Sequence, residues 1–348
     1  MFKSLFGKFS KDLGIDLGTS NTVVYVKDRG IVINEPSIVA INRRTEQILS
    51  VGREAREMLG KTPPHIEVCR PLLRGIISDF EVTEKMLRFF IDKVHEGGFN
   101  IMPRPRVVVG VPMEITEVER KAVEDAALSA GAREVFLVEE PMAAAIGARL
   151  PIEEADGNLI VDIGGGTTQI AVISLSGIVT WRAVTIAGDE MNKNIIQYSK
   201  DVFNLLLGEK HAENIKKRVA SAYRLSERQE VQMRGRDMLS GLPKEIIITD
   251  DHIREAIAGS IKTIVENVKM VLEATPPELV ADIYERGLVL CGGGALLAGL
   301  DKLIADYTSV PVRVADDPLT CVARGAGALL SNPALLKEVA LDTEQSKL

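Results

Sequence analysis

The sequence has few of the residue types that mark metal centres, disulfide scaffolds or membrane spans. It contains three cysteines and four histidines, all widely scattered. None of their spacings is that of a zinc site or a disulfide framework, so we expect neither, and this cysteine usage favours a reducing cytosol. No apolar run is long enough to span a membrane, and the first residues lack the apolar core and cleavage site of a signal peptide.

The sequence also has less positive than negative charge, and it lacks the motifs of the two commonest nucleotide-binding loops. The formal net charge is −7, which argues against nucleic acid as the main partner. Residues 60–62 read Gly-Lys-Thr, but Ala55 stands where a P-loop needs its first glycine. No Gly-x-Gly-x-x-Gly motif follows a predicted strand either. The sequence therefore argues against nucleotide binding through a P-loop or a dinucleotide-binding loop.

The chain has 348 residues, which is enough for two domains of ordinary size. Of these residues 46% are hydrophobic and 26% are charged, a balance typical of globular proteins. Apolar runs at 107–111, 135–138 and 288–290 are typical of buried strands, and they alternate with helical patterns such as 82–95 and 250–273. This alternation predicts an α/β fold with mainly parallel sheet cores. The tail after Asn332 has little to bury, so we expect it to be frayed or disordered.

One motif occurs twice. Residues 16–22 read Asp-Leu-Gly-Thr-Ser-Asn-Thr, and residues 162–168 read Asp-Ile-Gly-Gly-Gly-Thr-Thr, each between two apolar runs. This pattern predicts a hairpin whose tip exposes backbone N–H groups, which suit phosphate, with an aspartate at its base, which suits Mg²⁺. One copy alone would be read as an ordinary turn. Two copies predict a duplicated fold that closes on a nucleotide from both sides.

Three further motifs each have two interpretations. The glycines at 292–294 allow close approach of a base or phosphate, or form a simple turn before a helix. Glu140 ends a strand and precedes Pro141, so it could orient a water that attacks the γ-phosphate, or only stabilise a helix start. Glu213 and Lys216 lie on one face of a predicted helix. They could hold a nucleoside between them, or form a solvent-exposed ion pair.

The first nine residues form an apolar stripe at helical spacing, made by Phe2, Leu5, Phe6 and Phe9. Lysines flank the stripe, so the pattern favours an interfacial helix that folds on anionic lipid. The alternative is a lead-in segment packed on the core. A second apolar stretch at 99–102 could touch the same membrane surface, or be a packed loop.

Taken together, these residues resemble the actin, sugar-kinase and heat-shock-chaperone ATPase superfamily and, within it, the MreB family of bacterial actins. The resemblance covers nearly the whole chain. Its most distinctive strings, besides the two turns, are Asn-Glu-Pro-Ser at 34–37, Gly-Ile-Ile-Ser-Asp-Phe at 75–80, and Glu-Glu-Pro-Met-Ala-Ala-Ala-Ile-Gly at 139–147.

The resemblance implies an actin-like duplicated ATPase fold: two domains, each with a central mixed sheet, around an inter-domain nucleotide cleft. Domain I would comprise residues 1–149 and 321–348, with a small insertion subdomain near 33–74. Domain II would comprise residues 150–320, with an insertion near 183–246. Residues 1–9 would be the membrane-binding segment.

The resemblance also implies a cytoskeletal ATPase that binds ATP or ADP with Mg²⁺ and hydrolyses ATP slowly, with stimulation by assembly. The chain would polymerise with itself into filaments of paired antiparallel protofilaments. These would lie in the cytoplasm, peripheral on the inner face of the cytoplasmic membrane, with cell-elongation membrane proteins as partners and no nucleic acid. The filaments would organise the cell-wall synthesis that sets rod shape.

Individual residues take roles by the same resemblance. Asp16 and Asp162 would hold Mg²⁺, and Glu140 with Thr167 would position the attacking water. The helix that begins after Thr116 would lie between protofilaments, with Val118 as a candidate contact. A larger set would contact the phosphates and the adenosine: Gly18, Thr19, Ser20, Asn21, Gly164, Gly165, Gly166, Thr167, Glu213, Lys216, Gly292, Gly293 and Gly294.

Two residues depart from the family pattern, Gln169 where many members have Glu and Asn192 where Asp is usual. Fewer carboxylates could change Mg²⁺ affinity or hydrolysis rate, which leaves open a regulatory or scaffold module of the same fold with little turnover. A small-molecule kinase is a second alternative, although we identify no sugar- or acid-specific pocket with a catalytic aspartate. A chaperone ATPase would need a substrate-binding domain, and only a short tail follows Asn332.

Overall fold

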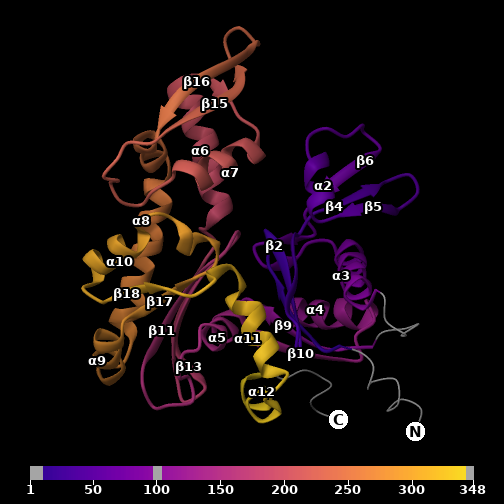
Figure 1. Cartoon of the computed structure of the whole chain (residues 1–348), viewed down its shortest axis with the longest axis vertical. Helices are drawn as coiled ribbons and strands as arrows, with labels where there is room; N and C mark the ends of the chain where they lie inside the picture. Colours follow the sequence, from indigo (N-terminus) through magenta and orange to yellow (C-terminus); the bar gives the residue numbers. More distant parts are fainter. Residues whose placement is uncertain (1–10, 97–103, 342–348) are drawn as a thin grey trace. The chain divides into compact units, whose positions relative to one another are not determined.

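A computed structural model describes residues 11–96 and 104–341 of the chain. The chain divides into two compact units. Unit 1 comprises Met1–Asp156, Ile173–Ile178 and Leu319–Leu348, and unit 2 comprises Gly157–Val172 and Val179–Pro318. Each unit combines one five-stranded sheet with helices and a smaller sheet (Figure 1).

The two large sheets share one strand order. The first sheet runs β10 (Glu134–Glu139), β9 (Arg106–Val111), β1 (Leu13–Leu17), β2 (Asn21–Val26), β3 (Gly30–Pro36). The second runs β18 (Val312–Val314), β17 (Leu288–Cys291), β11 (Asn158–Ile163), β12 (Thr168–Ser174), β13 (Gly177–Val184). In both, the first three strands are parallel, and each copy of the repeated motif joins the third strand to the fourth. The predicted duplication is therefore confirmed at the level of topology.

The helices beside the first sheet begin at or close to the expected positions, with α3 starting two residues before the predicted 82–95. In α3 (Phe80–His95), Asp79 caps the start by accepting a hydrogen bond from the Val82 N–H at 3.1 Å. In α4 (Glu117–Ser129), Thr116 and Glu119 form the reciprocal capping pair, which satisfies N–H groups that the first turn leaves unpaired. The apolar stripe of α3 is buried in the core of unit 1.

Two glycine-bearing helices cross closely in unit 1, namely α5 (Glu140–Gly147) and α11 (Cys321–Leu329) (Figure 1). A Cβ atom on Gly147 would collide with the Cys321 carbonyl group, and one on Gly325 would collide with that of Ala143. Only glycine allows the two backbones to approach so closely. The crossing places α11 in unit 1 against β1 and β2, the strands that flank the first motif turn.

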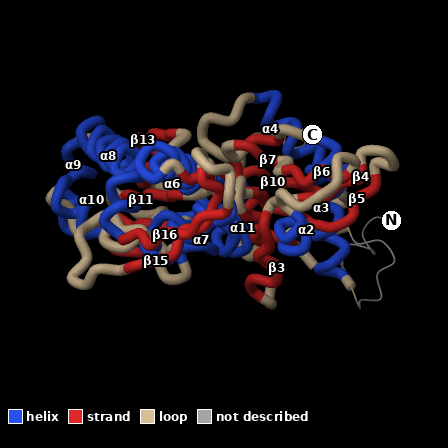
Figure 2. The backbone as a smooth tube through the Cα atoms, turned by 90° about the horizontal axis from the view of Figure 1, so that it is seen from above, coloured by secondary structure: helices blue, strands red, loops and turns tan. Residues whose placement is uncertain are grey.

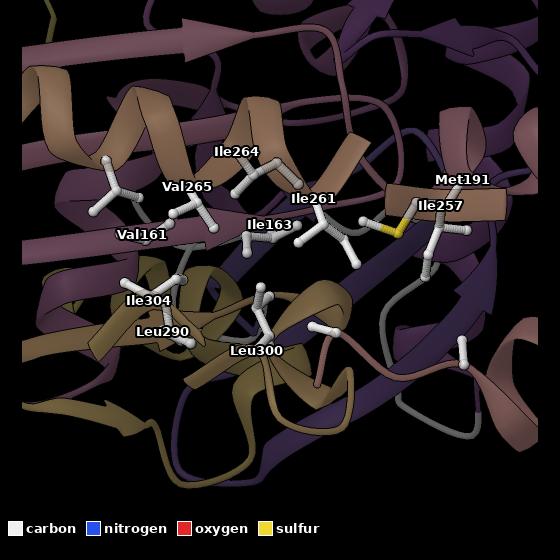
Figure 3. Packing of buried hydrophobic residues seen from close by; sticks show 14 of the residues in the cluster. Val161, Ile163, Met191, Ile257, Ile261, Ile264, Val265, Leu290, Leu300 and Ile304 are labelled. Atoms are coloured by element: carbon white, nitrogen blue, oxygen red, sulfur yellow. The ribbon is translucent and has the colours of Figure 1, made fainter. Parts of the chain in front are cut away.

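The core of unit 2 is a layer of aliphatic side chains between the second sheet and its helices (Figure 3). It joins β11 and β17 to α6 (Gly188–Phe203), α8 (Asp250–Ala274) and α10 (Leu300–Thr308). The labelled members are Val161, Ile163, Met191, Ile257, Ile261, Ile264, Val265, Leu290, Leu300 and Ile304. This packing fixes the carboxyl end of β11, where the second motif begins.

Each unit also carries a small sheet. In unit 1 it is formed by β5 (Gln47–Val51), β4 (Val39–Asn42) and β6 (Ile66–Cys69), with the short helix α2 (Arg53–Met58) and the separate pair β7 (Leu72–Leu73) and β8 (Ile76–Ile77). In unit 2 it is formed by β14 (Leu205–Leu206), β15 (Glu230–Asp237) and β16 (Pro243–Thr249). Helix α7 (Glu209–Val219) packs against β15 (Figure 2).

The expectation of a frayed tail is wrong for the residues that follow Asn332. They form α12 (Pro333–Val339), whose first turn is capped by the Asn332 side chain and whose Leu335 and Leu336 are buried. The Leu341 N–H then donates to the Leu137 carbonyl oxygen at 2.8 Å, which covers part of the edge of β10. The apolar residues of this tail therefore have a partner that is distant in sequence.

Two other features differ from expectation. A helix that we did not predict, α9 (Pro277–Arg286), precedes β17, and the last two residues of the triglycine begin a 3₁₀ turn, η2 (Gly293–Leu296), before α10. The predicted membrane residues Phe2, Leu5, Phe6 and Phe9, and the stretch at 99–102, lie outside the described residues. No helix in the described part of the chain is both long and apolar enough to cross a bilayer.

Candidate functional site

The two motif aspartates occupy the same position in their sheets. Asp16 pairs with Gly110 of the neighbouring parallel strand, and Asp162 pairs with Cys291 in the same way. Both pairs lie at the carboxyl ends of the parallel strands, which is the edge where α/β sheets bind ligands. Each unit thus presents one carboxylate at its ligand-binding edge.

The first turn is held in shape by hydrogen bonds from other parts of unit 1. A Cβ on Gly18 would lie 2.8 Å from the Asn21 carbonyl oxygen, so the turn requires glycine there. The Thr19 hydroxyl accepts a hydrogen bond from the Gly75 N–H at 2.7 Å, which leaves its own proton to donate. The Asn21 amide donates to the Asn34 side-chain oxygen at 2.8 Å. These hydrogen bonds fix the shape of the turn, while Ser20 and Asn21 remain partly exposed.

Glu140 is the first residue of α5, directly after β10, and its side chain is only 7% exposed. It lies over Gly110, the strand residue between Asp16 and Val138 in the sheet. Neighbouring strands are about 4.8 Å apart, so the backbones of Asp16 and Val138 are about 10 Å apart across Gly110. Unit 1 therefore gathers the carboxylates of Asp16 and Glu140 at one edge of its sheet.

Glu139, the residue before Glu140, shows how strongly this edge is desolvated. Burial raises the pKa of the Glu139 carboxyl above its usual value, and the charge of Arg120 on α4 partly opposes this shift. The junction of β10 and α5 therefore carries two consecutive carboxyl groups, of which Glu139 is partly buried and Glu140 is buried.

The second turn is closed by its own backbone and joined to a helix start. The Gly164 N–H donates to the Thr167 carbonyl oxygen at 2.9 Å. Two N–H groups at the start of α6, those of Gly188 and Asp189, donate to the carbonyl oxygens of Gly164 and Gly165. Such a turn beside a helix N-terminus is favourable for an anion. Gly166 and the Thr167 side chain remain partly exposed.

The triglycine lies against the base of the second turn. A Cβ on Gly292 would collide with the Asp162 carboxylate, and one on Gly294 would collide with the Ile163 side chain. Burial raises the pKa of Asp162 to about 6, although a hydrogen bond from Cys291 acts in the opposite direction. Gly293, between them, is exposed. A cation close to Asp162 would offset the cost of this buried charge.

The donor groups fit Mg²⁺ better than a structural metal. The described residues contain no cluster of three or more His, Cys, Asp or Glu side chains that could hold an ion by themselves. Mg²⁺ usually keeps several of its waters and binds through one or two carboxylates and substrate phosphates. Each unit presents one carboxylate of this kind at the edge of its sheet, Asp16 in unit 1 and Asp162 in unit 2.

The predicted nucleoside clamp is arranged differently from a simple ion pair. The Lys216 ammonium group donates to the Gly188 carbonyl oxygen at 2.5 Å, next to the second turn. Glu213 instead pairs with Lys217 at 2.6 Å, four residues further along α7. Lys216 is thus held beside the second turn, and a contact of either residue with a nucleoside stays a prediction.

The two residues that depart from the family pattern are both buried. Gln169 lies in β12, and Asn192 lies in the first turns of α6. The Asn192 side-chain oxygen accepts no hydrogen bond from the residues that the structure describes. Val118, in contrast, is 80% exposed in the first turn of α4.

Sequence reasoning assigned no role to several residues that shape this site. Asn34, Ser37 and Gly75 support the first turn, and Gly110 allows Val322 to pack closely beside Glu140. The segments 34–37 and 75–80 were distinctive of the family in sequence. Their contacts with the first turn could not be predicted, because they join residues far apart in the chain. Gly110 looks in sequence like one weak position in an apolar strand.

Comparisons with known proteins identify the family. The sequence pattern of the MreB/Mbl protein family matches residues 10–338. The chain is 52% identical over 334 residues to the cell shape-determining protein MreB of Escherichia coli K12, which covers 95% of this chain and 96% of that protein. It is 49% identical over 324 residues to the cell shape-determining protein Mbl of Bacillus subtilis 168, with 93% and 97% covered.

Solved structures agree in fold. MreB5 of Spiroplasma citri bound to ADP superposes with a TM-score of 0.88 at 36% identity, covering 95% of this chain and 98% of that one. The AMPPNP-bound form gives 0.89 at 36% identity, with 97% and 99% covered. A MamK double helical filament subunit shares the fold, with a TM-score of 0.78 at 22% identity and 93% and 99% covered. The chain therefore belongs to the MreB/Mbl family and has its actin-like fold.

Proposed function

We propose that this chain is a cytoskeletal ATPase that polymerises into membrane-associated filaments and organises the cell-wall synthesis that sets rod shape. The observation that carries the proposal is the equivalence of Asp16 and Asp162, each at the base of a glycine-containing turn on the ligand edge of its sheet. The relatives at 52% and 49% identity are cell shape-determining proteins, which supports the cellular role.

The ligand would be ATP or ADP with Mg²⁺, held by both domains. We keep the boundaries that the resemblance implies, 1–149 with 321–348 for domain I and 150–320 for domain II. The MreB5 structures contain ADP or AMPPNP, which supports an adenine nucleotide. Asp16 and Asp162 would hold the ion through its waters, and the two turns would donate backbone N–H groups to the phosphates.

Hydrolysis would need a water aligned with the γ-phosphate. Glu140 would accept a hydrogen bond from that water and take up its proton, and Thr167 would fix the orientation of the water. Because Glu140 and Thr167 come from different units, small changes in domain angle would alter their alignment. Assembly would therefore stimulate hydrolysis, which would be slow in the monomer.

The partners of the filament would be copies of this chain and a membrane surface. Val118 on α4 would contact a second, antiparallel protofilament. Phe2, Leu5, Phe6 and Phe9 would insert into the inner face of the cytoplasmic membrane, where cell-elongation membrane proteins would meet the filament. Deleting residues 1–9 should abolish co-sedimentation with anionic liposomes, and binding unaffected by the deletion would refute an anchor there.

Phosphate release measured over a range of protein concentrations tests the enzymatic part. The rate per molecule should be low at low concentration and should rise above a threshold at which filaments form. A constant rate per molecule would contradict stimulation by assembly. Formation of ADP without an equal release of phosphate, in the presence of carbohydrate acceptors, would instead identify the small-molecule kinase alternative.

A second candidate is a regulatory or scaffold module with little turnover. It is favoured by the two buried neutral residues, Gln169 and Asn192, at positions where the family usually carries a carboxylate. Tight nucleotide binding without phosphate release at any protein concentration would support this candidate. Recovery of turnover in Gln169→Glu would then identify that residue as the cause.

A further inference from the structure

We propose that Ser37 and Asn34 are positioning residues for the nucleotide phosphates, because they hold the first turn in its phosphate-binding shape. The inference rests on the proposed function and extends it to a segment, residues 34–37, that would not itself touch the nucleotide. Asn34 lies in β3, and Ser37 follows its last residue, Pro36.

Ser37 is joined to the first turn by three hydrogen bonds. Its side chain is completely buried, and its hydroxyl donates to the Gly18 carbonyl oxygen at 2.6 Å. The same hydroxyl lies 2.9 Å from that of Thr22, and the Ser37 N–H donates to the Ser20 carbonyl oxygen at 3.0 Å. One residue therefore fixes two carbonyl groups of a turn that spans only four residues.

The direction of these carbonyl groups decides where the turn can donate. A trans peptide group is planar, so its N–H points opposite to its C=O. When Ser37 holds the Gly18 carbonyl oxygen on its own side, the Thr19 N–H is turned to the other side. The Ser20 carbonyl and the Asn21 N–H are related in the same way. Ser37 therefore sets the orientation of the two N–H groups that a phosphate nest would use.

Asn34 acts on the side chain at the end of the turn. Its side-chain oxygen accepts a hydrogen bond from the Asn21 amide nitrogen at 2.8 Å, which fixes the orientation of that amide. Asn34 and Ser37 are three residues apart, so one short segment orients both the backbone and a side chain of the turn. Between them, Glu35 accepts a hydrogen bond from the Arg53 N–H at the start of α2, which anchors the segment.

The chain offers a matched control for the loss of a buried serine hydroxyl. Ser199 in α6 is also completely buried, and its hydroxyl donates to the Leu205 carbonyl oxygen at 2.9 Å. Its second partner is the sulfur of Met233, so it contacts neither motif turn. Ser37→Ala and Ser199→Ala should therefore destabilise the fold to a similar extent, and only Ser37→Ala should affect ligand binding.

The test is equilibrium binding of ATP with Mg²⁺ to the full chain, with adenosine as a competing ligand that lacks phosphate. Loss of one orienting hydrogen bond should weaken ATP binding about threefold to tenfold in Ser37→Ala. Adenosine binding should be unchanged. Asn34→Ala should weaken ATP binding in the same direction, and Ser199→Ala should bind ATP like the wild type while its melting temperature falls.

Two results would overturn the inference alone: ATP binding by Ser37→Ala as tight as by the wild type, or equal weakening in Ser37→Ala and Ser199→Ala. Equal loss of ATP and adenosine affinity in Ser37→Ala would also contradict it, because a general loss of structure would then be the cause. A wild-type chain that binds no ATP would instead overturn the proposed function, and this inference with it.

Discussion

The side chain of Glu140 lies over Gly110, where an added Cβ atom would come within 3.5 Å of the Glu140 Cγ. Gly110 is also the direct strand neighbour of Asp16. The Glu140 side chain therefore lies at contact distance from this strand position, next to Asp16, the proposed metal ligand. The buried strand β9 and the start of α5 therefore belong to one candidate site.

Gly110→Ala should disturb the packing next to Glu140 and slow hydrolysis more than it weakens nucleotide binding, because the new Cβ atom would lie 2.7 Å from the Val322 Cγ1 but only at ordinary contact distance from Glu140. The close contact with Val322 should also lower the unfolding free energy by about 1–3 kcal/mol. Phosphate release and ATP affinity, measured on the same preparation, separate the two effects. Gly259→Ala is the control, since that exposed helical glycine has open space around it and should gain about 0.5–1 kcal/mol.

Glu140→Ala should slow phosphate release by about 10²-fold or more, because general-base assistance typically contributes that much. ATP affinity should stay close to that of the wild type. Glu139→Gln, one residue earlier, removes a carboxylate without removing the proposed base and should retain most of the activity. Loss of ATP binding together with hydrolysis in Glu140→Ala would give Glu140 a structural role instead.

Val118→Asp should prevent pairing of protofilaments without unfolding the chain. Val118 is 80% exposed, so the substitution should change the unfolding free energy by no more than about 0.5 kcal/mol. Electron microscopy should show single protofilaments or none, with ATP affinity unchanged. Met270→Asp on α8 replaces another exposed apolar helical residue and serves as the control. Normal paired filaments in Val118→Asp would remove Val118 from the interface.

His95 should lower the unfolding free energy as the pH drops below about 6.5, while the raised pKa of Asp162 acts in the opposite direction. His95 bonds the Ile91 carbonyl oxygen at 2.7 Å and accepts the Lys11 N–H at 3.2 Å. Burial lowers the pKa of His95; the hydrogen bond to Ile91 and the charge of Asp92 oppose this, and the charge of Lys11 adds to it.

The sign of this effect follows from proton binding. Between the lowered pKa of folded His95 and the ordinary value, the unfolded chain binds more protons than the folded chain. The contribution of His95 to stability is therefore fully present above about pH 6.5 and is lost below it. Urea unfolding at several pH values should show a smaller decrease in His95→Gln than in the wild type. An identical decrease would contradict the contribution of His95. His211, whose pKa burial also lowers, remains in both proteins and acts in the same direction.

The parts of the fold that sequence could predict are those that local chemistry determines. The two hairpins follow from apolar runs around glycine-containing turns, and the start of α4 follows from the Thr116 and Glu119 pair. Helix α12 was missed because Leu335 and Leu336 find their burial only against residues far away in the chain. A short segment has no local signal for such a partner.

The candidate site divides in the same way. Asp16, Asp162 and the turn glycines were visible because the motif repeats, and Glu140 was visible because Pro141 marks a helix start. The contacts of Ser37 with Gly18 and of Lys216 with Gly188 join residues that no local pattern connects. Sequence identifies the groups that would touch the ligand, and the structure adds those that orient them.

The most direct test of the central claim is sedimentation of the purified full chain with Mg²⁺ and ATP, with and without anionic liposomes, followed by electron microscopy of the pellet. We expect filaments with ATP, and their association with the lipid surface. A chain that remains monomeric with every nucleotide and lipid would contradict the account.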